Sequence, residues 1–433
     1  MNLIQKNRLL FLRGSLLMVL KLLTNFGHNA FFLGYTLGSY NVKLLFMALI
    51  IFYLTYIFSP DPSLFWLRLV LLFVGIFFTT SNLWVFFITF EVTIVTVRYL
   101  LLNFGNYPEK IPAFLYMILY SRAGGLPLLL GIILSSKLNG RPRLYLYTHS
   151  HLALLVLPAF LIKLPIFGLH GWLPLVHVQA PVWARIILAA VLLKMGGYGL
   201  LILINRTFKE TYWIRLAGVL GSIFALSHCL FENDAKKIVA FRRIGHIGLV
   251  IISAFWNNEQ TVNGSINIIV AHGFVSSAMF YLLNILTVQV GSRRLSQLKG
   301  LYVPLPIFRL VALGLLCCNS SLPPSLNFFG EVISIIGLTT LFPTIFPLIF
   351  CLILLRGLFN AFLLARITKN NPSLLQLTDL KRRDLTLLVC HLIPVSTFWV
   401  WFFKIAKIFY TNLKGSTPVF FMFLTLIWNK VSS

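Results

Sequence analysis

The sequence is poor in charged residues and poorest in acidic ones. Only 11% of its 433 residues are charged, with 10 Asp and Glu against 36 Lys and Arg. A water-soluble chain of this length would have too few polar side chains to cover its surface. The composition therefore excludes an ordinary soluble protein and favours one whose solvent is the lipid bilayer.

The sequence also lacks the motifs of redox and nucleotide sites. Its cysteines form no C-x-x-C pair and no metal-ligand spacing, and we interpret them as structural thiols. There is no G-x-G-x-x-G, no P-loop and no H-E-x-x-H motif. We therefore expect no cofactor, metal or redox centre in this chain. The five cysteines are Cys229, Cys317, Cys318, Cys351 and Cys390.

A formal net charge of +26 would suggest nucleic acid as the partner of a soluble protein. In a membrane chain, basic residues near short loops instead anchor helices at anionic headgroups, so we expect lipid as a partner and no nucleic acid. Two basic clusters follow the fifth and tenth expected spans, on opposite sides of the membrane, so they do not fix the orientation. They contain Lys137, Arg141 and Arg143, and Arg293, Arg294 and Lys299.

Long apolar runs dominate what is present, since 58% of the residues are hydrophobic. A helix crosses the bilayer with about 20 apolar residues, and helices satisfy their backbone groups within lipid. We predict an all-α, polytopic membrane protein with about fourteen transmembrane helices. The expected spans are residues 9–25, 42–59, 64–80, 82–103, 112–135, 151–169, 182–204, 212–231, 238–256, 265–289, 304–322, 332–346, 347–367 and 385–409.

Glu91 lies near the middle of an apolar span, between Phe90 and Val92. A charge at the bilayer centre is costly, so an intramembrane carboxylate indicates function and needs a partner. The alternative is a protonated glutamate that makes a hydrogen bond between helices. We interpret Glu91 as a functional carboxylate.

Lys194 lies deep in another span, just before Gly196, Gly197 and Gly199. Clustered glycines weaken a helix, and a broken helix at membrane depth needs protein or a hydrated cavity around it, so we expect a break here. Burial favours the neutral amine and a nearby carboxylate favours the charged one, as a proton relay requires. The alternative is a lysine that reaches the membrane interface.

Other ionisable residues are less decisive on sequence alone. Lys163 lies before a distortion expected between Pro165 and Pro174, and either relays protons or supports the local backbone. Lys236 begins a span, where surface charge pairing is an equal alternative, and Asp384 precedes the last strong span. Four histidines are candidates for proton exchange, although each is equally explained by packing. They are His170, His177, His246 and His272.

Three motifs in order carry a resemblance to a known family: His170 to Pro174 (HGWLP), His177 to Pro181 (HVQAP) and Leu192 to Gly199 (LLKMGGYG). With them the chain resembles the subunit 4 family of NADH dehydrogenase, antiporter-like membrane subunits of respiratory complex I. Ordered matches run from about residue 84 to residue 391. Further matches lie at Phe90-Glu91, Asn106 to Glu109, Asn233 to Lys236, Ala271 to Gly273, Ser276-Ser277, Leu322 to Asn327 and Gly330-Glu331.

The resemblance implies a fold and a function. It implies two inverted five-helix repeats with broken helices, in a proton-translocating core over residues 81–410. Residues 1–80 would be amino-terminal membrane helices with a weak match, and residues 411–433 an interfacial tail. The chain would couple NADH oxidation and ubiquinone reduction to proton pumping across the inner mitochondrial membrane. FMN, iron-sulfur clusters and ubiquinone would belong to other subunits, and subunits 2 and 5 would be neighbours.

The resemblance also implies roles for individual residues. Glu91 would tune the pump lysine, Lys194 would lie on the first broken helix, and Lys236 would join the two half-channels. Asp384 would be the exit carboxylate, although its side chain is shorter than the glutamate usual in the family. The histidines would belong to or support the hydrated axis: His246 and His272 within it, His170 and His177 beside it.

The chain departs from the family at several positions. Gln179 stands where the family usually has glutamate, and four arginines stand where it usually has serine. One explanation is genuine arginines that line hydrated cavities, because such residues are costly in a span. We favour another: many invertebrate mitochondria read AGA and AGG as serine, and the sequence was translated with a different code. The arginines are Arg185, Arg242, Arg243 and Arg294.

Two other functions fit the sequence. An independent antiporter that exchanges sodium or potassium for protons would have the same lysines, but it would purify alone rather than in a large assembly. A structural membrane subunit would have no proton path, and its Glu91 and Lys194 would tolerate apolar replacement.

Overall fold

The described residues are almost entirely helical. The computed structural model describes residues 39–59, 63–105, 108–139, 150–204, 212–255, 259–297, 306–341, 346–368 and 383–396. Among them an isolated bridge pairs Asp234 with Arg294 between two helices. The predicted all-α class is therefore confirmed. The expected span 9–25, residues 397–409 of the last span and the tail 411–433 lie outside the described residues.

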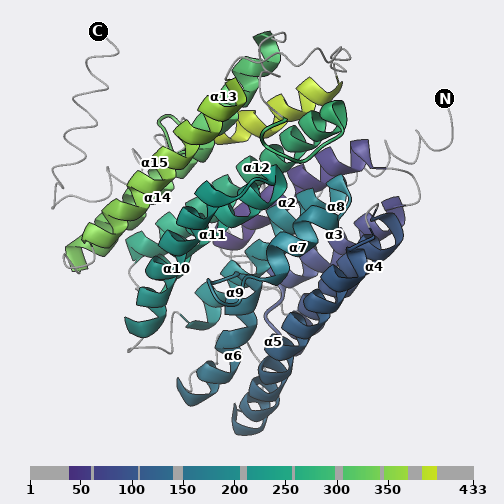
Figure 1. Cartoon of the computed structure of the whole chain (residues 1–433). Coiled ribbons are helices and arrows are strands. Elements are labelled where there is room, and N and C mark those ends of the chain that lie inside the picture. The colour runs from purple at the N-terminus through teal and green to yellow at the C-terminus, as the bar shows by residue number, and fades with distance from the viewer. Residues whose placement is uncertain are drawn as a thin grey trace.

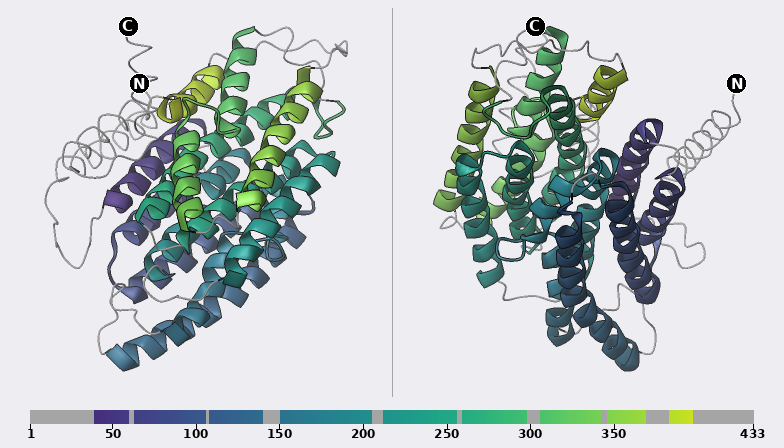
Figure 2. Two further views of the ribbon diagram at one scale, coloured as in Figure 1. Left: turned by 90° about the vertical axis from the view of Figure 1, so that its left-hand side faces the viewer. Right: turned by 45° about the vertical axis from the view of Figure 1, so that its right-hand side comes forward.

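The helices form one bundle, with α4 and α5 at one side and α13 to α15 at the other (Figures 1 and 2). A further helix covers residues 383–396. The amino-terminal elements are α2 (Ser39–Phe58), α3 (Leu64–Thr79), α4 (Leu83–Phe104), α5 (Lys110–Asn139), α6 (Ser150–Lys163), α7 (Trp172–Gln179), α8 (Val182–Ile187), the π-helical turn η3 (Leu188–Leu192) and α9 (Leu193–Ile204). The later elements are α10 (Tyr212–Phe231), α11 (Ala235–Ala254), α12 (Glu259–Val290), α13 (Pro306–Asn319), α14 (Leu326–Leu341) and α15 (Phe346–Thr368).

Several helices have the length and composition of membrane spans. Five stretches of the described residues are long and apolar enough to cross a bilayer, and further apolar helices are shorter. The polytopic membrane architecture is thus confirmed. The five stretches are Leu83–Phe104, Lys110–Lys137, Val182–Ile202, Trp213–Phe231 and Gln260–Val290.

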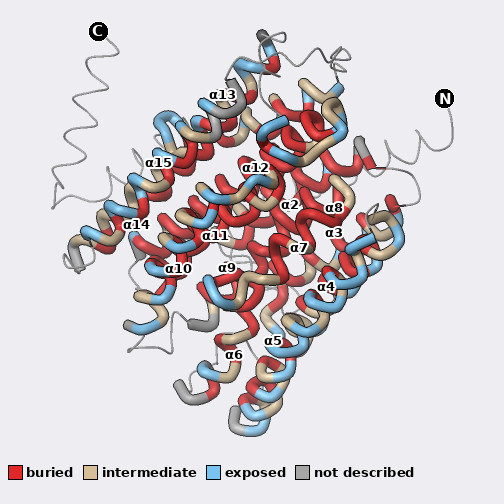
Figure 3. The backbone as a smooth tube through the Cα atoms, in the orientation of Figure 1, coloured by how far each residue is buried: buried red, intermediate tan, exposed pale blue. Residues whose placement is uncertain are grey.

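The centre of the bundle is α12 with the helix formed by α8, η3 and α9. In the most apolar windows of these two helices 100% and 94% of the residues are buried, against 33% in α5. Figure 3 shows the same gradient, with buried residues along α11 and α12 and exposed ones along α5. The exposed face of α5 is apolar, for example at Leu119 and Leu126, as expected for contact with lipid.

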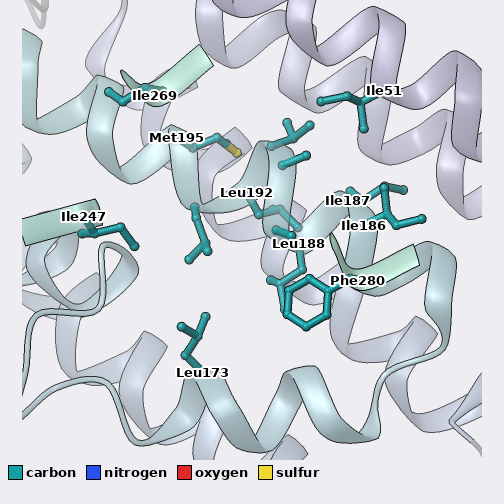
Figure 4. Packing of buried hydrophobic residues seen from close by; sticks show 14 of the residues in the cluster. Ile51, Leu173, Ile186, Ile187, Leu188, Leu192, Met195, Ile247, Ile269 and Phe280 are labelled. Atoms are coloured by element: carbon teal, nitrogen blue, oxygen red, sulfur yellow. The ribbon is translucent and has the colours of Figure 1, made fainter. Parts of the chain in front are cut away.

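Close packing holds the central helices together, because lipid is as apolar as leucine and gives helices little reason to associate. Ile187, Leu188 and Leu192 pack with Leu173 of α7 and Phe280 of α12 (Figure 4). Elsewhere α12 and α14 are so close that a glycine of each helix lies against the backbone of the other. A Cβ added at Gly264 would lie 2.8 Å from the Ser334 nitrogen, and one at Gly330 would lie 2.9 Å from the Ile268 nitrogen.

The first broken helix is α6 with α7. The expected helix over residues 151–169 is confirmed as far as Lys163, where α6 ends, and a loop leads to α7, which begins at Trp172. Pro165 has no amide hydrogen to continue the ladder, and Gly168 has φ of +98°, which glycine adopts readily. The indole of Trp172 donates to the Ile162 carbonyl at 3.1 Å, satisfying one backbone acceptor that the break exposes.

The expected break beside Lys194 is wrong. The helix runs from Val182 to Ile204 without interruption, and its irregularity is the π-helical turn just before the lysine. The glycines allow close packing instead. A Cβ at Gly196 would lie 3.0 Å from Lys163 Cβ, and one at Gly199 would collide with the Phe160 ring. These glycines therefore bring α9 against α6 rather than breaking the helix.

The second broken helix is α13 with α14. The expected spans 304–322 and 332–346 correspond to helices that end at Asn319 and resume at Leu326. Between them Pro323 and Pro324 remove two backbone donors, which stops the helix. Each half of the chain thus contains one broken helix.

Candidate functional site

Glu91 of α4 lines a small cavity. The cavity has a volume of about 30 Å³ and lies between α4, α5, α6, α7 and the α8–α9 helix. Its walls are mostly apolar, with Glu91, Lys163, Tyr120 and Ser121 among the polar residues. A space of this volume between polar groups can hold a water molecule. The lining therefore combines a carboxylate, an amine and room for a proton-carrying water.

The Glu91 carboxylate has no protein partner for one of its oxygens. Its Oε1 atom is buried without a hydrogen bond. A Cβ added at Gly125 of α5 would lie 2.7 Å from that oxygen, so the glycine makes room for the carboxylate. A buried oxygen with no donor is costly, and a water molecule in the cavity relieves the cost. Glu91 is therefore placed to accept a hydrogen bond from such a water.

Lys163 shares this cavity with Glu91. Its side chain is buried, and Nζ donates to the Phe90 carbonyl at 3.0 Å and lies 2.9 Å from the centre of the Phe90 ring. Glu91 attracts the lysine electrostatically, whereas Arg98 repels it. Lys163 is also the last residue of α6, where the helix dipole favours a cation. The structure thus brings Glu91 together with Lys163.

Lys194 lies on the other side of its helix. Its Nζ is buried and donates to the Ala189 carbonyl in the π-helical turn at 3.0 Å. Gly196, two positions later and so about 200° around the helix, faces α6 instead. The charged groups that act on Lys194 or respond to it are Arg243, His177 and His272. The structure therefore places Lys194 with the histidines of the bundle centre.

His246 and His272 lie side by side in the bundle centre. Their rings, on α11 and α12, have centroids 4.9 Å apart and an interplanar angle of 28°. His246 Nε2 and both ring nitrogens of His272 are buried without a hydrogen-bond partner. Buried polar atoms of this kind are commonly satisfied by water. The two histidines expected in a hydrated axis are thus neighbours.

Glu331 was missed as a site residue from the sequence. It lies in α14, where its Oε1 is 3.1 Å from His246 Nδ1 and 2.6 Å from Arg356 Nη1 of α15. Arg356 also donates to the Gly245 carbonyl at 2.8 Å. A signal was available, because Glu331 is one of ten acidic residues and follows Gly330 in a family motif.

Lys236 and Asp384 lie away from this group. Lys236 is buried at the start of α11, ten positions or about 15 Å before His246, and its amide donates to the capping Asp234 carboxylate. Asp384 accepts a 2.7 Å hydrogen bond from the Tyr281 hydroxyl of α12 and is half-buried. It therefore lies in a contact between helices rather than in a fully solvated loop.

The two other histidines occupy different settings. His177 is buried, and its Nε2 accepts from Arg243 at 2.9 Å while its ring stacks on Phe280. His170 lies in the loop of the first broken helix, stacked on Phe167 with centroids 4.6 Å apart. His177 thus belongs to the bundle centre, and His170 to the edge of the break.

Three of the four unusual arginines are buried. Arg242 donates to the Asn319 carbonyl at 2.7 Å and to Asn360, while Arg185 donates to the Ala180 carbonyl at 2.7 Å. Arg243 keeps its Nε and Nη2 buried without partners, and Arg242 its Nε. Arg294 is exposed. The buried guanidinium groups are incompletely satisfied, which is costly in a membrane domain.

The described residues bring no three His, Cys, Asp or Glu side chains together in a way that would hold a metal ion. All five cysteines are free thiols. Gln179, which replaces the usual family glutamate, donates to Glu109 with a distance of 2.5 Å between Nε2 and Oε2.

The chain, with its buried ionisable groups on broken and irregular membrane helices, matches a known family. Residues 80–355 match the sequence model of the NADH:quinone oxidoreductase/Mrp antiporter transmembrane family. The chain belongs to this family. The matched segment contains both broken helices and the ionisable groups described above, except Arg356 and Asp384.

Individual relatives agree with this membership. The chain is 35% identical to NADH-ubiquinone oxidoreductase chain 4 of Ceratitis capitata over 279 residues, which is 62% of this chain and 62% of that relative. It is 31% identical to the chain 4 of Scyliorhinus canicula over 350 residues, 75% of this chain and 76% of that relative. The resemblance to subunit 4 inferred from the motifs is thus confirmed.

A solved structure has the same fold. A chain of respiratory complex I from Thermus thermophilus with bound NADH superimposes with a TM-score of 0.81, covering 91% of each chain. The two sequences are 20% identical, so this likeness concerns the fold alone. This chain is an antiporter-like membrane subunit by fold and by family.

Proposed function

We propose that this chain translocates protons in the membrane arm of respiratory complex I, coupling NADH oxidation and ubiquinone reduction to proton pumping across the inner mitochondrial membrane. The observation that carries this proposal is the cavity shared by Glu91 and Lys163, an unpartnered carboxylate oxygen beside a buried amine. An anion and a cation in one small cavity stabilise each other, so a change in one alters the proton affinity of the other.

The buried ionisable groups suggest the order of the proton path. Ubiquinone reduction elsewhere in the complex changes the protonation of Glu91 and Lys163 at the first broken helix. Lys194, on the far side of α9, responds and exchanges a proton with His272 and His246. Lys236, at the start of α11, joins the two half-channels, and Asp384 is the exit carboxylate. His170 and His177 support the break and the bundle centre.

Each step of this path is electrostatic. Lys194 and His272 repel each other when both are protonated, so gain of a proton by one group favours its loss by the next. Charge moved at Glu91 thereby affects α12 through the intervening α9. The helices themselves need not move far, because α6 and α9 are in backbone contact at Gly196.

The test is replacement of Glu91 by Gln and of Lys194 by Met in the assembled complex. Each variant should lose proton pumping through this subunit while NADH oxidation and assembly are largely kept, because the side chains retain their approximate volume. The protons pumped per electron are measured in reconstituted vesicles. Glu232→Gln is the matched control, since Glu232 follows α10 outside the membrane span. A normal ratio in Glu91→Gln and Lys194→Met would refute the proposal.

The chief rival is an independent cation antiporter, because the family includes Mrp antiporters. Purification of the native chain separates the two functions. A complex I subunit purifies with a large assembly that contains flavin and iron-sulfur clusters, whereas an independent antiporter purifies without them. We infer that FMN, the clusters and ubiquinone are bound by other subunits, and that subunits 2 and 5 are the neighbours.

A further inference from the structure

Arg122 is an exposed cation in the middle of a membrane helix. It belongs to α5, whose apolar stretch runs from Lys110 to Lys137. At a rise of 1.5 Å per residue, Arg122 lies about 18 Å from one end of this stretch and about 22 Å from the other. Gly125, three residues later, is the residue that makes room for Glu91, so Arg122 lies near the depth of that carboxylate. Its side chain is too short to cross the roughly 15 Å of hydrocarbon on either side and reach the lipid headgroups.

Lipid is a costly environment for this side chain. An arginine at the bilayer centre almost always faces protein or a water-filled cavity, because acyl chains offer neither a hydrogen bond nor a counter-charge. No described carboxylate forms an ion pair with Arg122. An exposed arginine at this depth therefore indicates that something other than lipid covers it in the membrane.

The charged side chains around Arg122 carry an excess of positive charge. Arg98 of α4 is buried, donates to the Ser121 hydroxyl of α5 and repels Arg122. Lys163 is a further cation at this depth, in the cavity that it shares with Glu91. Three cations thus stand beside one described carboxylate. This side of the chain lacks the anion that would balance Arg122.

The chain itself has no suitable acid for Arg122. Of its ten acidic residues, six have side chains that the structure describes, and none of these pairs with Arg122. The terminal segments 1–38 and 397–433 contain no Asp or Glu. A mid-membrane carboxylate for Arg122 therefore has to come from another chain. The remaining four acids fall between helices in the sequence or at the first residue of one: Asp61, Glu210, Glu259 and Asp379.

The exposed residues beside Arg122 have the spacing of a helix-packing seam. Leu115, Leu119, Arg122 and Leu126 are exposed and follow one another at intervals of four, three and four residues. This spacing places them on one face of α5, along which a second helix can pack side by side (Figure 3). The leucines alone would suit lipid, but the arginine among them does not. A single polar residue in such a seam fixes the register of the partner helix.

We propose that this face of α5 binds a membrane helix of another subunit, and that this helix supplies an aspartate or glutamate at mid-membrane depth to pair with Arg122. The inference rests on the proposed function, in which the chain is one subunit of a larger assembly. The guanidinium can hold a carboxylate through two parallel hydrogen bonds. The pair thereby sets the height of the two subunits relative to each other in the membrane.

The test compares three variants in the assembled complex. Arg122→Leu leaves the partner's carboxylate unpaired, so this chain should be released from its neighbours at about half the detergent concentration that releases the wild type. Arg122→Lys keeps a cation and should be retained nearly as well as the wild type. Arg309→Leu is the matched control, because Arg309 is exposed in the first turn of α13, and it should be retained fully. Against lipid, Arg122→Leu would remove a costly charge, so retention equal to or firmer than that of the wild type would overturn the proposal.

A density map of the native complex covers the case in which Arg122→Leu does not assemble. A carboxylate of a different subunit should lie within about 4 Å of the Arg122 guanidinium. Acyl chains, water alone, a second copy of this chain or an acid of this chain in that place would overturn the proposal. So would a residue other than arginine at position 122 in peptide mass spectra of the native protein.

Purification separates this inference from the proposed function. A chain that purifies alone, without flavin and iron-sulfur clusters, refutes the proposed function and removes the partner subunit with it. A chain that purifies in that assembly, with acyl chains covering Arg122, refutes the contact at α5 and leaves the proposed function intact.

Discussion

Glu91 and Glu331 lie on membrane helices in opposite halves of the chain, α4 and α14, and differ in their partners. Glu91 has a buried oxygen without a hydrogen bond and shares a cavity with Lys163. Glu331 accepts from Arg356 and contacts His246. A buried ion pair holds both of its side chains in place, whereas an unpartnered oxygen can bind water. Two membrane carboxylates are thus prepared for different tasks.

The largest further effect on pumping is expected from a substitution that crowds Glu91 in the first half of the chain. In Gly125→Ala the new methyl group would lie 2.7 Å from Glu91 Oε1, so the carboxylate has to move or lose its space. Overpacking of this kind costs about 1–3 kcal/mol. We expect pumping to fall severalfold with assembly intact, as measured in reconstituted vesicles.

Gly75→Ala is the matched control, because nothing lies within 4 Å of the added Cβ and Gly75 also belongs to a membrane helix. If Gly125→Ala and Gly75→Ala pump equally well, the position of the Glu91 carboxylate does not affect pumping. The contrast drawn between Glu91 and Glu331 would then be contradicted.

A smaller effect is expected at the contact proposed for proton exit. Tyr281→Phe removes the hydroxyl that donates to Asp384 at 2.7 Å and leaves the ring in place. Loss of a hydrogen bond to a charged group costs about 1.5–3 kcal/mol when the acceptor is buried and less here, because Asp384 is half-buried. We expect a modest fall in pumping, and none from Tyr281→Phe in an Asp384→Asn background. If Tyr281→Phe lowers pumping equally in the wild type and in the Asp384→Asn background, Tyr281 does not act through Asp384.

The smallest expected effect concerns the identity of Arg242 and Arg243 in α11. Peptide mass spectrometry across Phe241 to His246 should find serine at positions 242 and 243, in line with the buried guanidinium nitrogens that lack partners. Detection of arginine at both positions would end the idea of a different genetic code.

The fold was largely predictable from the sequence, because apolar runs of membrane length determine where helices lie. The positions of the breaks were not. Three glycines after Lys194 predicted a break, but they allow contacts with Lys163, Ile269 and Phe160, and such tertiary packing has no signature along the chain. Pro165, in contrast, was correctly associated with a distortion.

The candidate site was predictable only residue by residue. Glu91 was identified from a single carboxylate in an apolar span, and His246 and His272 from the resemblance. Their grouping depends on helices distant in sequence, so the pairing of Glu91 with Lys163 could not be derived.

The end of α6 has a consequence for leakage. Its carbonyl oxygens at Phe160, Leu161 and Ile162 accept from the Leu164 amide, the Ile166 amide and the Trp172 indole. An interrupted helix would otherwise offer bare acceptors that draw a file of water through the membrane. Because these three are occupied, the end of α6 offers fewer backbone acceptors to water, which limits passive proton leakage beside the buried Lys163.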